Sequence, residues 1–319
     1  MTRIAAIDCG TNSIRLLVAE PDADGRLRDL TRQMRIVRLG QGVDRSGLLD
    51  LAAIERTLEA AREYREIIDS FGGVDRLRFV ATSAVRDARN REEFIAGIRD
   101  ILGCEPEVIP GAEEASLSFR GAASGVPVDL PRPMLVVDIG GGSTELVLGD
   151  RDVQQSISID MGSVRVTEKF FADCDPAAGI PAEAEAAAVT WIDEQLDAAR
   201  THVDLSQVGT LVGVAGTVTT VTAQALGLPN YQPHRIHGAV LTVDEIGIAV
   251  RFMVDQPIAV KKALGFMPAG REDVIAAGAL IWSRIISRVC SETATRGHII
   301  DRVVTSEHDI LDGIALSIL

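Results

Sequence analysis

The sequence is short of cysteine, of long apolar runs and of familiar nucleotide-binding loops, and each shortage excludes a class of protein. Its four cysteines form no CxxC pair, which argues against a disulfide framework or a zinc site and fits a reducing cytoplasm. No apolar run approaches the length that spans a bilayer, so we expect a cytoplasmic protein with no membrane partner. A GxxxxGK[ST] motif is missing, which argues against a P-loop NTPase.

Basic and aromatic residues are also in the minority. The chain has 46 acidic and 32 basic residues, a formal net charge of -14, which argues against a nucleic-acid partner. An anionic ligand would need local compensation from arginine, backbone N–H groups or a metal ion. Aromatic residues make up 4% and hydrophobic residues 46% of the 319 residues, so we expect a core of small aliphatic side chains and room for two domains.

An internal repeat is the main organisational signal. The segment IAAIDCGTNSIRLLVAE at the N-terminus is matched by MLVVDIGGGSTELVLGD after Pro133, which aligns Asp8 with Asp138 and Ser13 with Ser143. Each copy has an apolar strand, an Asp, a glycine-containing turn and a second apolar run, which predicts a β-hairpin. Two equivalent hairpins predict two related α/β domains.

Chain breakers at 122–133 mark the expected boundary between these domains. We predict a first domain at 1–125 and a second at 133–305, with a terminal helix at 306–319 that can pack back on the first. Two helix starts are predicted from local patterns: Asn90 with Glu93 as a capping box, and Ser306 as the N-cap of the terminal helix.

Both hairpin turns have the composition of a phosphate cradle. Glycines let backbone N–H groups converge, and hydroxyl and amide side chains add donors. The residues concerned are Gly10, Thr11, Asn12 and Ser13 in the first turn and Gly140, Gly141, Gly142 and Ser143 in the second. The alternative for each is an ordinary tight turn, and the duplication favours phosphate binding.

Three acidic residues lie beside these turns and could bind a metal ion. Asp8 and Asp138 end their strands and Glu145 follows the glycine turn, a set of hard oxygen ligands suited to Mg²⁺. The alternative is that an Asp at a strand end accepts hydrogen bonds from turn N–H groups.

Three further segments carry polar residues at strand-to-helix turns. Thr82, Ser83 and Arg86 form a possible anion-binding corner, with a solvated arginine as the alternative, and Gly216 with Thr217 could hold another phosphate. Glu113 and Glu114 open a helix, where the dipole keeps a carboxylate ionised as a base requires, although most such glutamates are ordinary helix-start residues. His234 and His237 lie in a loop and are interpreted as structural.

Taken together, the motifs resemble the exopolyphosphatase and guanosine pentaphosphate phosphohydrolase (Ppx/GppA) family. They run in order over nearly the whole chain: DCGTNSIRLLV, ATSAVRDARN, PGAEEASL, VVDIGGGSTELV, MGSVRVTE, VAGTVTT, RIHG, GREDVIAAG and SEHDILDG. The resemblance implies an α/β fold of two ribonuclease-H-like domains flanking a cleft, as in the superfamily of actin, Hsp70 and sugar kinases.

The resemblance also implies roles for individual residues. Glu114 would be the base for an attacking water, and Asp138 and Glu145 would bind Mg²⁺ or orient that water. The turn residues named above would contact phosphates, with Arg165 and Arg271 as further contacts. The implied substrate is polyphosphate, of short chain length, or pppGpp, hydrolysed by a homodimer. The chain matches a short form of the family without C-terminal helical domains, and Leu311 stands where an Arg is common.

Two other classes of function stay open at this level. A sensor that binds polyphosphate or guanosine alarmones would need the phosphate cradle, but the presence of Glu114, Asp138 and Glu145 favours an enzyme. A phosphotransferase or ATPase of the same superfamily would share the hairpins, whereas the GREDVIAAG segment and the helix with Glu114 fit the phosphatase family better.

Overall fold

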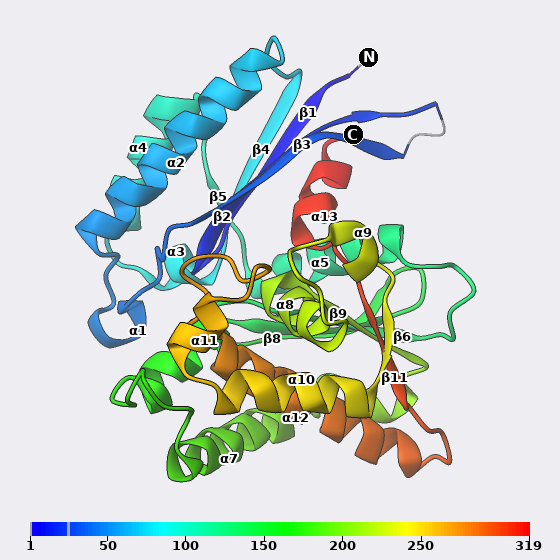
Figure 1. The fold of residues 1–319 in the computed structure, drawn as a ribbon. Coiled ribbons are helices and arrows are strands. Elements are labelled where there is room, and N and C mark those ends of the chain that lie inside the picture. Colours follow the sequence, from blue (N-terminus) through cyan, green and yellow to red (C-terminus); the bar gives the residue numbers. More distant parts are fainter. Residues whose placement is uncertain (1, 24–25) are drawn as a thin grey trace. The chain divides into compact units, whose positions relative to one another are not determined.

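The chain folds into two compact units, each built on a mixed β-sheet. The computed structural model describes residues 2–23 and 26–319. The first unit comprises Met1–Gly121 with Ile310–Leu319, and the second comprises Ala122–Asp309. Figure 1 shows the elements of both units, which are described separately below.

The first unit contains a five-stranded sheet in the order β3-β2-β1-β4-β5. Its strands are β1 (Ile4–Cys9), β2 (Ser13–Pro21), β3 (Leu27–Ile36), β4 (Arg76–Ala81) and β5 (Glu107–Val108). The strands β1, β2 and β3 run antiparallel, whereas β4 and β5 are parallel to β1. This order and these directions are the ones expected of a ribonuclease-H-like domain.

Alternation along β1 assigns its residues to two faces of this sheet. Ala5, Ile7 and Cys9 join one apolar cluster, and Ile4 and Ala6 join another. The first cluster includes α2 (Leu51–Ser70) and α4 (Arg91–Leu102), which lie side by side in Figure 1. The second includes α5 (Gly111–Gly125) and α13 (Ile310–Ser317). The short helices α1 (Val43–Ser46) and α3 (Ser83–Asp87) complete this unit.

The second unit repeats this plan with a six-stranded sheet in the order β10-β11-β9-β6-β7-β8. Its strands are β6 (Met134–Ile139), β7 (Thr144–Gly149), β8 (Val153–Ile159), β9 (Thr210–Val214), β10 (Val240–Thr242) and β11 (Arg302–Thr305). Its helical elements are α6 (Ser163–Val166), a π-helix (Thr167–Phe171), α7 (Ala182–Ala199), a 3₁₀ turn (Leu205–Gln207), α8 (Ala215–Ala225), α9 (Pro233–Ile236), α10 (Val243–Asp255), α11 (Ile258–Lys262) and α12 (Ile275–Ala294).

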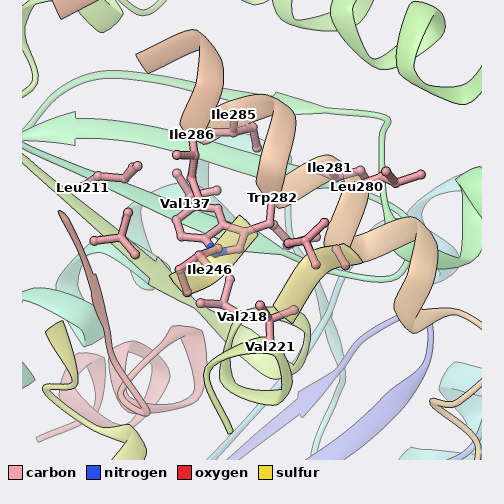
Figure 2. Packing of buried hydrophobic residues seen from close by; sticks show 14 of the residues in the cluster. Val137, Leu211, Val218, Val221, Ile246, Leu280, Ile281, Trp282, Ile285 and Ile286 are labelled. Atoms are coloured by element: carbon pink, nitrogen blue, oxygen red, sulfur yellow. The ribbon is translucent and has the colours of Figure 1, made fainter. Parts of the chain in front are cut away.

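Trp282 of α12 lies at the centre of the second core. Figure 2 shows its ring among Val137 of β6, Val218 of α8 and Ile246 of α10, and its side chain is fully buried. A Cβ at Gly213 would lie 2.9 Å from the indole ring, so β9 carries a glycine where the ring packs against it. The indole therefore fixes the end of β9 from which α8 begins.

The expected fold class is confirmed, while two predicted side-chain caps are wrong. Asn90 is the N-cap residue of α4, as predicted, but its side chain makes no cap, because its Oδ1 accepts a hydrogen bond from Leu49 N (2.8 Å) in the loop between α1 and α2. Ser306 does not cap α13, which begins at Ile310; its Oγ donates to His308 O (2.9 Å) within a local turn. Among the described residues, no helix combines the length and apolar character needed to cross a membrane.

Candidate functional site

The glycine turn of the second unit is tied down through its carbonyl groups. Ser163 N donates to Gly140 O (2.9 Å), Val164 N to Gly141 O (2.8 Å) and Arg165 Nε to Gly142 O (2.9 Å). Over residues 2–23 and 26–319, the N–H groups of Gly141 and Gly142 have no hydrogen-bond acceptor. Since the carbonyls are occupied by α6, these N–H groups remain available to an anion.

Gly162 makes this close approach possible. A Cβ at Gly162 would overlap the carbonyl of Gly141 and lie 2.5 Å from Gly142 N, so no side chain fits there. Gly162 lies in the MGSVRVTE motif, but its importance does not follow from the sequence. Its role depends on a contact across 21 positions of the chain, which no local pattern reveals.

Asp138 and Glu145 form a pair of carboxylates beside this turn. They are register partners on the antiparallel strands β6 and β7, which places both side chains on one face of the sheet. Both are almost fully buried, with exposed fractions of 6% and 1%. Ser158 Oγ donates to Glu145 Oε1 (2.7 Å), which fixes that carboxylate.

The turn from β9 into α8 lies close to the same region of the second unit. A Cβ at Gly278 of α12 would lie 2.5 Å from Thr217 Oγ1 and 3.2 Å from Ser163 Cβ, so α12 contacts both the start of α8 and α6, the helix that binds the glycine turn. Ala215 has a φ of 66°, a left-handed conformation that is unusual for a residue with a side chain. The helix α12 thus packs against the turn at Thr217 and against α6, which in turn binds the glycine turn.

Arg271 lies against this turn. Its Nη1 donates to Gly216 O (3.1 Å) and to Thr220 Oγ1 (3.1 Å), and the side chain is largely buried. A Cβ at Gly216 would overlap the guanidinium group, so the glycine is needed for this packing. Arg271 therefore supports the turn that was predicted to hold phosphate.

The hairpin turn of the first unit is tied down in a similar way. Val37 N and Arg38 N donate to Asn12 O (3.0 and 2.9 Å), and Gly40 N donates to Thr11 O (2.8 Å). Thr11 Oγ1 is 2.9 Å from Ser83 Oγ, which joins the turn to the start of α3. Within the described residues, the buried Oδ1 of Asn12 lacks a hydrogen-bond partner, a feature that suits a ligand-binding position.

Asp8 of the first unit differs from Asp138. Its Oδ2 accepts hydrogen bonds from Arg15 Nε (2.9 Å) and Arg15 Nη2 (2.6 Å), and both side chains are mostly buried. The guanidinium group neutralises this carboxylate and occupies one of its oxygens. Asp8 is therefore less suited to a metal ion than the sequence suggested.

The two glutamates at the start of α5 have different surroundings. Glu114 is buried (7% exposed), and its Oε2 accepts from Arg86 Nη1 (3.1 Å), which also donates to Ile109 O (2.9 Å). Glu113 is more exposed and pairs with Arg78 (2.7 Å). Arg86 is thus bound to the predicted base, which excludes the alternative of a solvated arginine.

The remaining polar groups give no sign of a preformed metal cluster. Across the part of the chain that the structure describes, no group of three or more His, Cys, Asp and Glu residues could hold a metal ion. His237 stacks on His308 with ring centroids 4.7 Å apart, and its Nδ1 accepts from Glu307 N (3.2 Å). This contact supports the structural interpretation of His237.

Similarity to known proteins agrees with this arrangement. A profile of the Ppx/GppA phosphatase family matches residues 17–316. Exopolyphosphatase 2 of Mycobacterium tuberculosis is 43% identical over 327 aligned positions, which cover all of this chain and 99% of the relative.

Two solved structures extend the agreement to the fold. The crystal structure of an exopolyphosphatase-like protein superimposes with a TM-score of 0.93 at 44% identity, covering 99% of this chain and 98% of the other. The Aquifex aeolicus member of the Ppx/GppA family gives a TM-score of 0.77 at 31% identity, covering 99% and 97%. The chain belongs to the Ppx/GppA phosphatase family.

Proposed function

We propose that the protein is an exopolyphosphatase, which hydrolyses the terminal phosphoanhydride of inorganic polyphosphate. The observation that carries the proposal is the turn at Gly140–Gly142, whose carbonyl groups are bound to α6 while the N–H groups of Gly141 and Gly142 are left for an anion. The similarity to a mycobacterial exopolyphosphatase supports the same assignment.

Each unit offers its own set of donors for phosphate. In the second unit the donors are the glycine turn, Ser143 and the start of α8 at Gly216 and Thr217. In the first unit they are Thr11, Asn12 and Ser13 of the hairpin turn, together with Thr82 and Ser83 at the start of α3. Gly10 closes this turn, because its N–H donates to Ser13 O (2.9 Å). Preorganised N–H and hydroxyl donors of this kind stabilise the charge that develops on a transferred phosphoryl group.

The carboxylates of the second hairpin fit a magnesium ion. Asp138 and Glu145 offer hard oxygen ligands on one face of the sheet, and Mg²⁺ is often held by one or two carboxylates plus water and substrate phosphate. Asp8 fits less well because Arg15 binds it. When bound, the ion would neutralise phosphate charge and orient the oxygens of the substrate.

Glu114 is the proposed general base, and Arg86 is the group that controls it. Arg86 pairs with the Glu114 carboxylate (3.1 Å), and the ionised carboxylate is the form that accepts a proton. A terminal phosphate carries more negative charge than a carboxylate, so it would draw Arg86 toward itself. Glu114 would then be left to hold the attacking water.

The bond changes follow from this placement. The water oxygen forms a bond to the terminal phosphorus as its proton passes to Glu114, and the bond from that phosphorus to the bridging oxygen breaks. The electron pair of the broken bond remains on the shortened chain. The products are orthophosphate and a polyphosphate that is one residue shorter.

The test is phosphate release in the presence of Mg²⁺, measured with short polyphosphate, long polyphosphate and pppGpp. We expect native protein to release phosphate from polyphosphate and Glu114→Gln to lose at least about 100-fold in kcat. The matched control is Glu113→Gln, which changes the neighbouring carboxylate and should retain activity. Tight binding by native protein without release from any substrate would contradict the proposal and favour a sensor.

Three finer predictions are tested alongside. Release from pppGpp at a rate comparable to polyphosphate would extend the substrate range to guanosine polyphosphates, and the ratio of short-chain to long-chain rates tests the expected preference for short chains. Light scattering coupled to size exclusion tests the predicted homodimer.

A further inference from the structure

The start of α5 presents two consecutive glutamates, and the fold assigns a different arginine to each. Glu114 is bound by Arg86 of α3, whereas Glu113 is bound by Arg78 of β4. Two adjacent carboxylates repel each other and would compete for the same cations and for the same water. The structure separates them by giving each its own guanidinium group.

Arg78 is held more firmly than a surface ion pair requires. Its Nη2 donates to Glu113 Oε1 (2.7 Å) and to Glu107 Oε2 of β5 (2.7 Å), and its Nη1 donates to Ser317 Oγ of α13 (2.7 Å). Its side chain is 13% exposed. Hydrogen bonds to Glu107 and then Glu113 raise the pKa of Arg78 above its ordinary value, so the group stays charged. Four elements therefore share one fixed cation.

The contact between α13 and α5 makes this arrangement rigid. A Cβ at Gly313 of α13 would overlap the carbonyl of Leu117, three residues beyond Glu114, so the two helix backbones touch. Arg120 of α5 also donates to Leu316 O (2.9 Å) of α13. Contacts at Leu117 and Arg120 thus hold α5 against α13, the helix whose Ser317 binds Arg78.

We propose that Arg78 is a positioning residue for Glu114: it neutralises Glu113 and holds that carboxylate against β4, β5 and α13, so that Glu114 alone interacts with Arg86 and the attacking water. This inference rests on the proposed role of Glu114 as the base. Glu113 is bound by Arg78 of β4, which also binds Glu107 of β5, and the adjacent Glu114 is bound by Arg86 of α3.

The test compares pH profiles of kcat/KM for four variants. In Arg78→Gln the Glu113 charge is uncompensated and favours the protonated form of the Glu114 carboxyl, so the acidic limb moves up by roughly half a pH unit. Arg78→Lys keeps the positive charge, and the double variant Arg78→Gln/Glu113→Gln removes the uncompensated carboxylate. Both should therefore keep the acidic limb of the kcat/KM profile at its native pH. Arg99→Gln breaks an exposed pair with Glu105 and is the matched control.

Thermal unfolding separates this role from a purely structural one. Arg78→Gln and the double variant lose the same contacts to Glu107 and Ser317. A return of the acidic limb to its native pH in the double variant therefore cannot come from regained stability. The proposal is overturned if the acidic limb of the kcat/KM profile does not move in Arg78→Gln, or if it stays shifted in the double variant. If Glu114→Gln keeps full activity, the assignment of the base fails instead.

Discussion

The two hairpins share a register but differ in the residue that faces the aspartate. Asp8 of β1 is opposite Arg15 of β2, and Asp138 of β6 is opposite Glu145 of β7. In both units the aspartate lies on the sheet face away from the larger helical layer. One exchange, arginine for glutamate, therefore turns a neutralised ion pair into a pair of carboxylates, and a duplicated scaffold acquires two different electrostatic roles.

The turns themselves are supported in parallel ways. In each unit the carbonyls of the turn accept hydrogen bonds from the segment that follows the third strand, Val37–Gly40 in the first and Ser163–Arg165 in the second. In each unit a glycine, Gly40 or Gly162, makes the approach possible. The backbone plan is thus common to both units, and the side chains distinguish them.

The largest expected effect comes from the carboxylate pair. Glu145→Gln should lower kcat on the order of 1000-fold and raise the Mg²⁺ concentration needed for half-maximal activity, because a hard ligand is lost while the shape is kept. Asp8→Asn should lower kcat less than about tenfold and leave the Mg²⁺ requirement unchanged, because Arg15 already binds this carboxylate. Its main effect should be on stability, since it removes one partner of a buried ion pair. Rates measured across a Mg²⁺ titration distinguish the two.

Equal shifts in the Mg²⁺ requirement would remove the proposed distinction between the hairpins. Asp138→Asn provides the second arm, since it should resemble Glu145→Gln in both readouts. Circular dichroism of each variant shows whether the fold is retained, which matters because both carboxylates are buried.

The next effect concerns the glycines that support the turns. In Gly162→Ala the new Cβ meets the backbone of Gly141, which cannot move aside, and we expect a loss of about 3 kcal/mol. In Gly40→Ala it meets Thr11 Cγ2, which a side-chain rotation can move, and lies 2.9 Å from Ala84 Cβ, which moves only with its backbone, so a smaller loss of about 2 kcal/mol is expected.

Urea unfolding measures both losses. Thr11→Ser removes the clashing methyl group, so it should recover part of the loss in Gly40→Ala, whereas no side-chain change is available to rescue Gly162→Ala. Equal losses for the two alanine variants would mean that the turn of the second unit relaxes as easily as that of the first.

The duplicated fold could be predicted from sequence because it depends on local alternation. The apolar runs around Asp8 and Asp138 repeat with a common spacing, and the hairpins follow from that pattern alone. Side-chain caps were harder to predict from sequence. The amide of Asn90 has an acceptor and a donor, and each can bind either its own helix or another loop. The loop at Leu49 binds it in the structure, and a local pattern does not include that loop.

The sequence predicted which residues form the site better than it predicted their ion-pair partners. The turns, the two carboxylates and the glutamate of α5 all follow from motifs, but the partners of Asp8 and of Glu114 do not. Arg15 is seven residues from Asp8 and Arg86 is 28 from Glu114, and both arginines were open to other roles until the register of the sheet and the position of α3 were known. Pairing of charges is a tertiary property.

The smallest expected effect is the change in stability when an alanine after the central strand pair is replaced by glycine, and it has opposite signs in the two units. The ladders pair Asp8 with Val80 and Asp138 with Val214, so Ala81 and Ala215 occupy equivalent positions one residue later. Ala215 has a φ of 66°, whereas Ala81 is a regular, fully buried strand residue. Ala215→Gly should therefore relieve left-handed strain and stabilise the protein by roughly 0.5 kcal/mol, after the entropic cost of glycine.

Ala81→Gly should destabilise by about 1.5 kcal/mol, because it removes a buried methyl group and adds backbone freedom without relieving strain. The midpoints of urea unfolding measure both changes, provided that the unfolding free energy depends on urea concentration with the same slope in each variant. If strain at Ala215 helps to aim the Gly216 turn at phosphate, the same variant will show a higher KM for polyphosphate despite its greater stability. A stabilised variant with an unchanged KM would mean that the contact of Arg271 with Gly216 is enough to hold the turn.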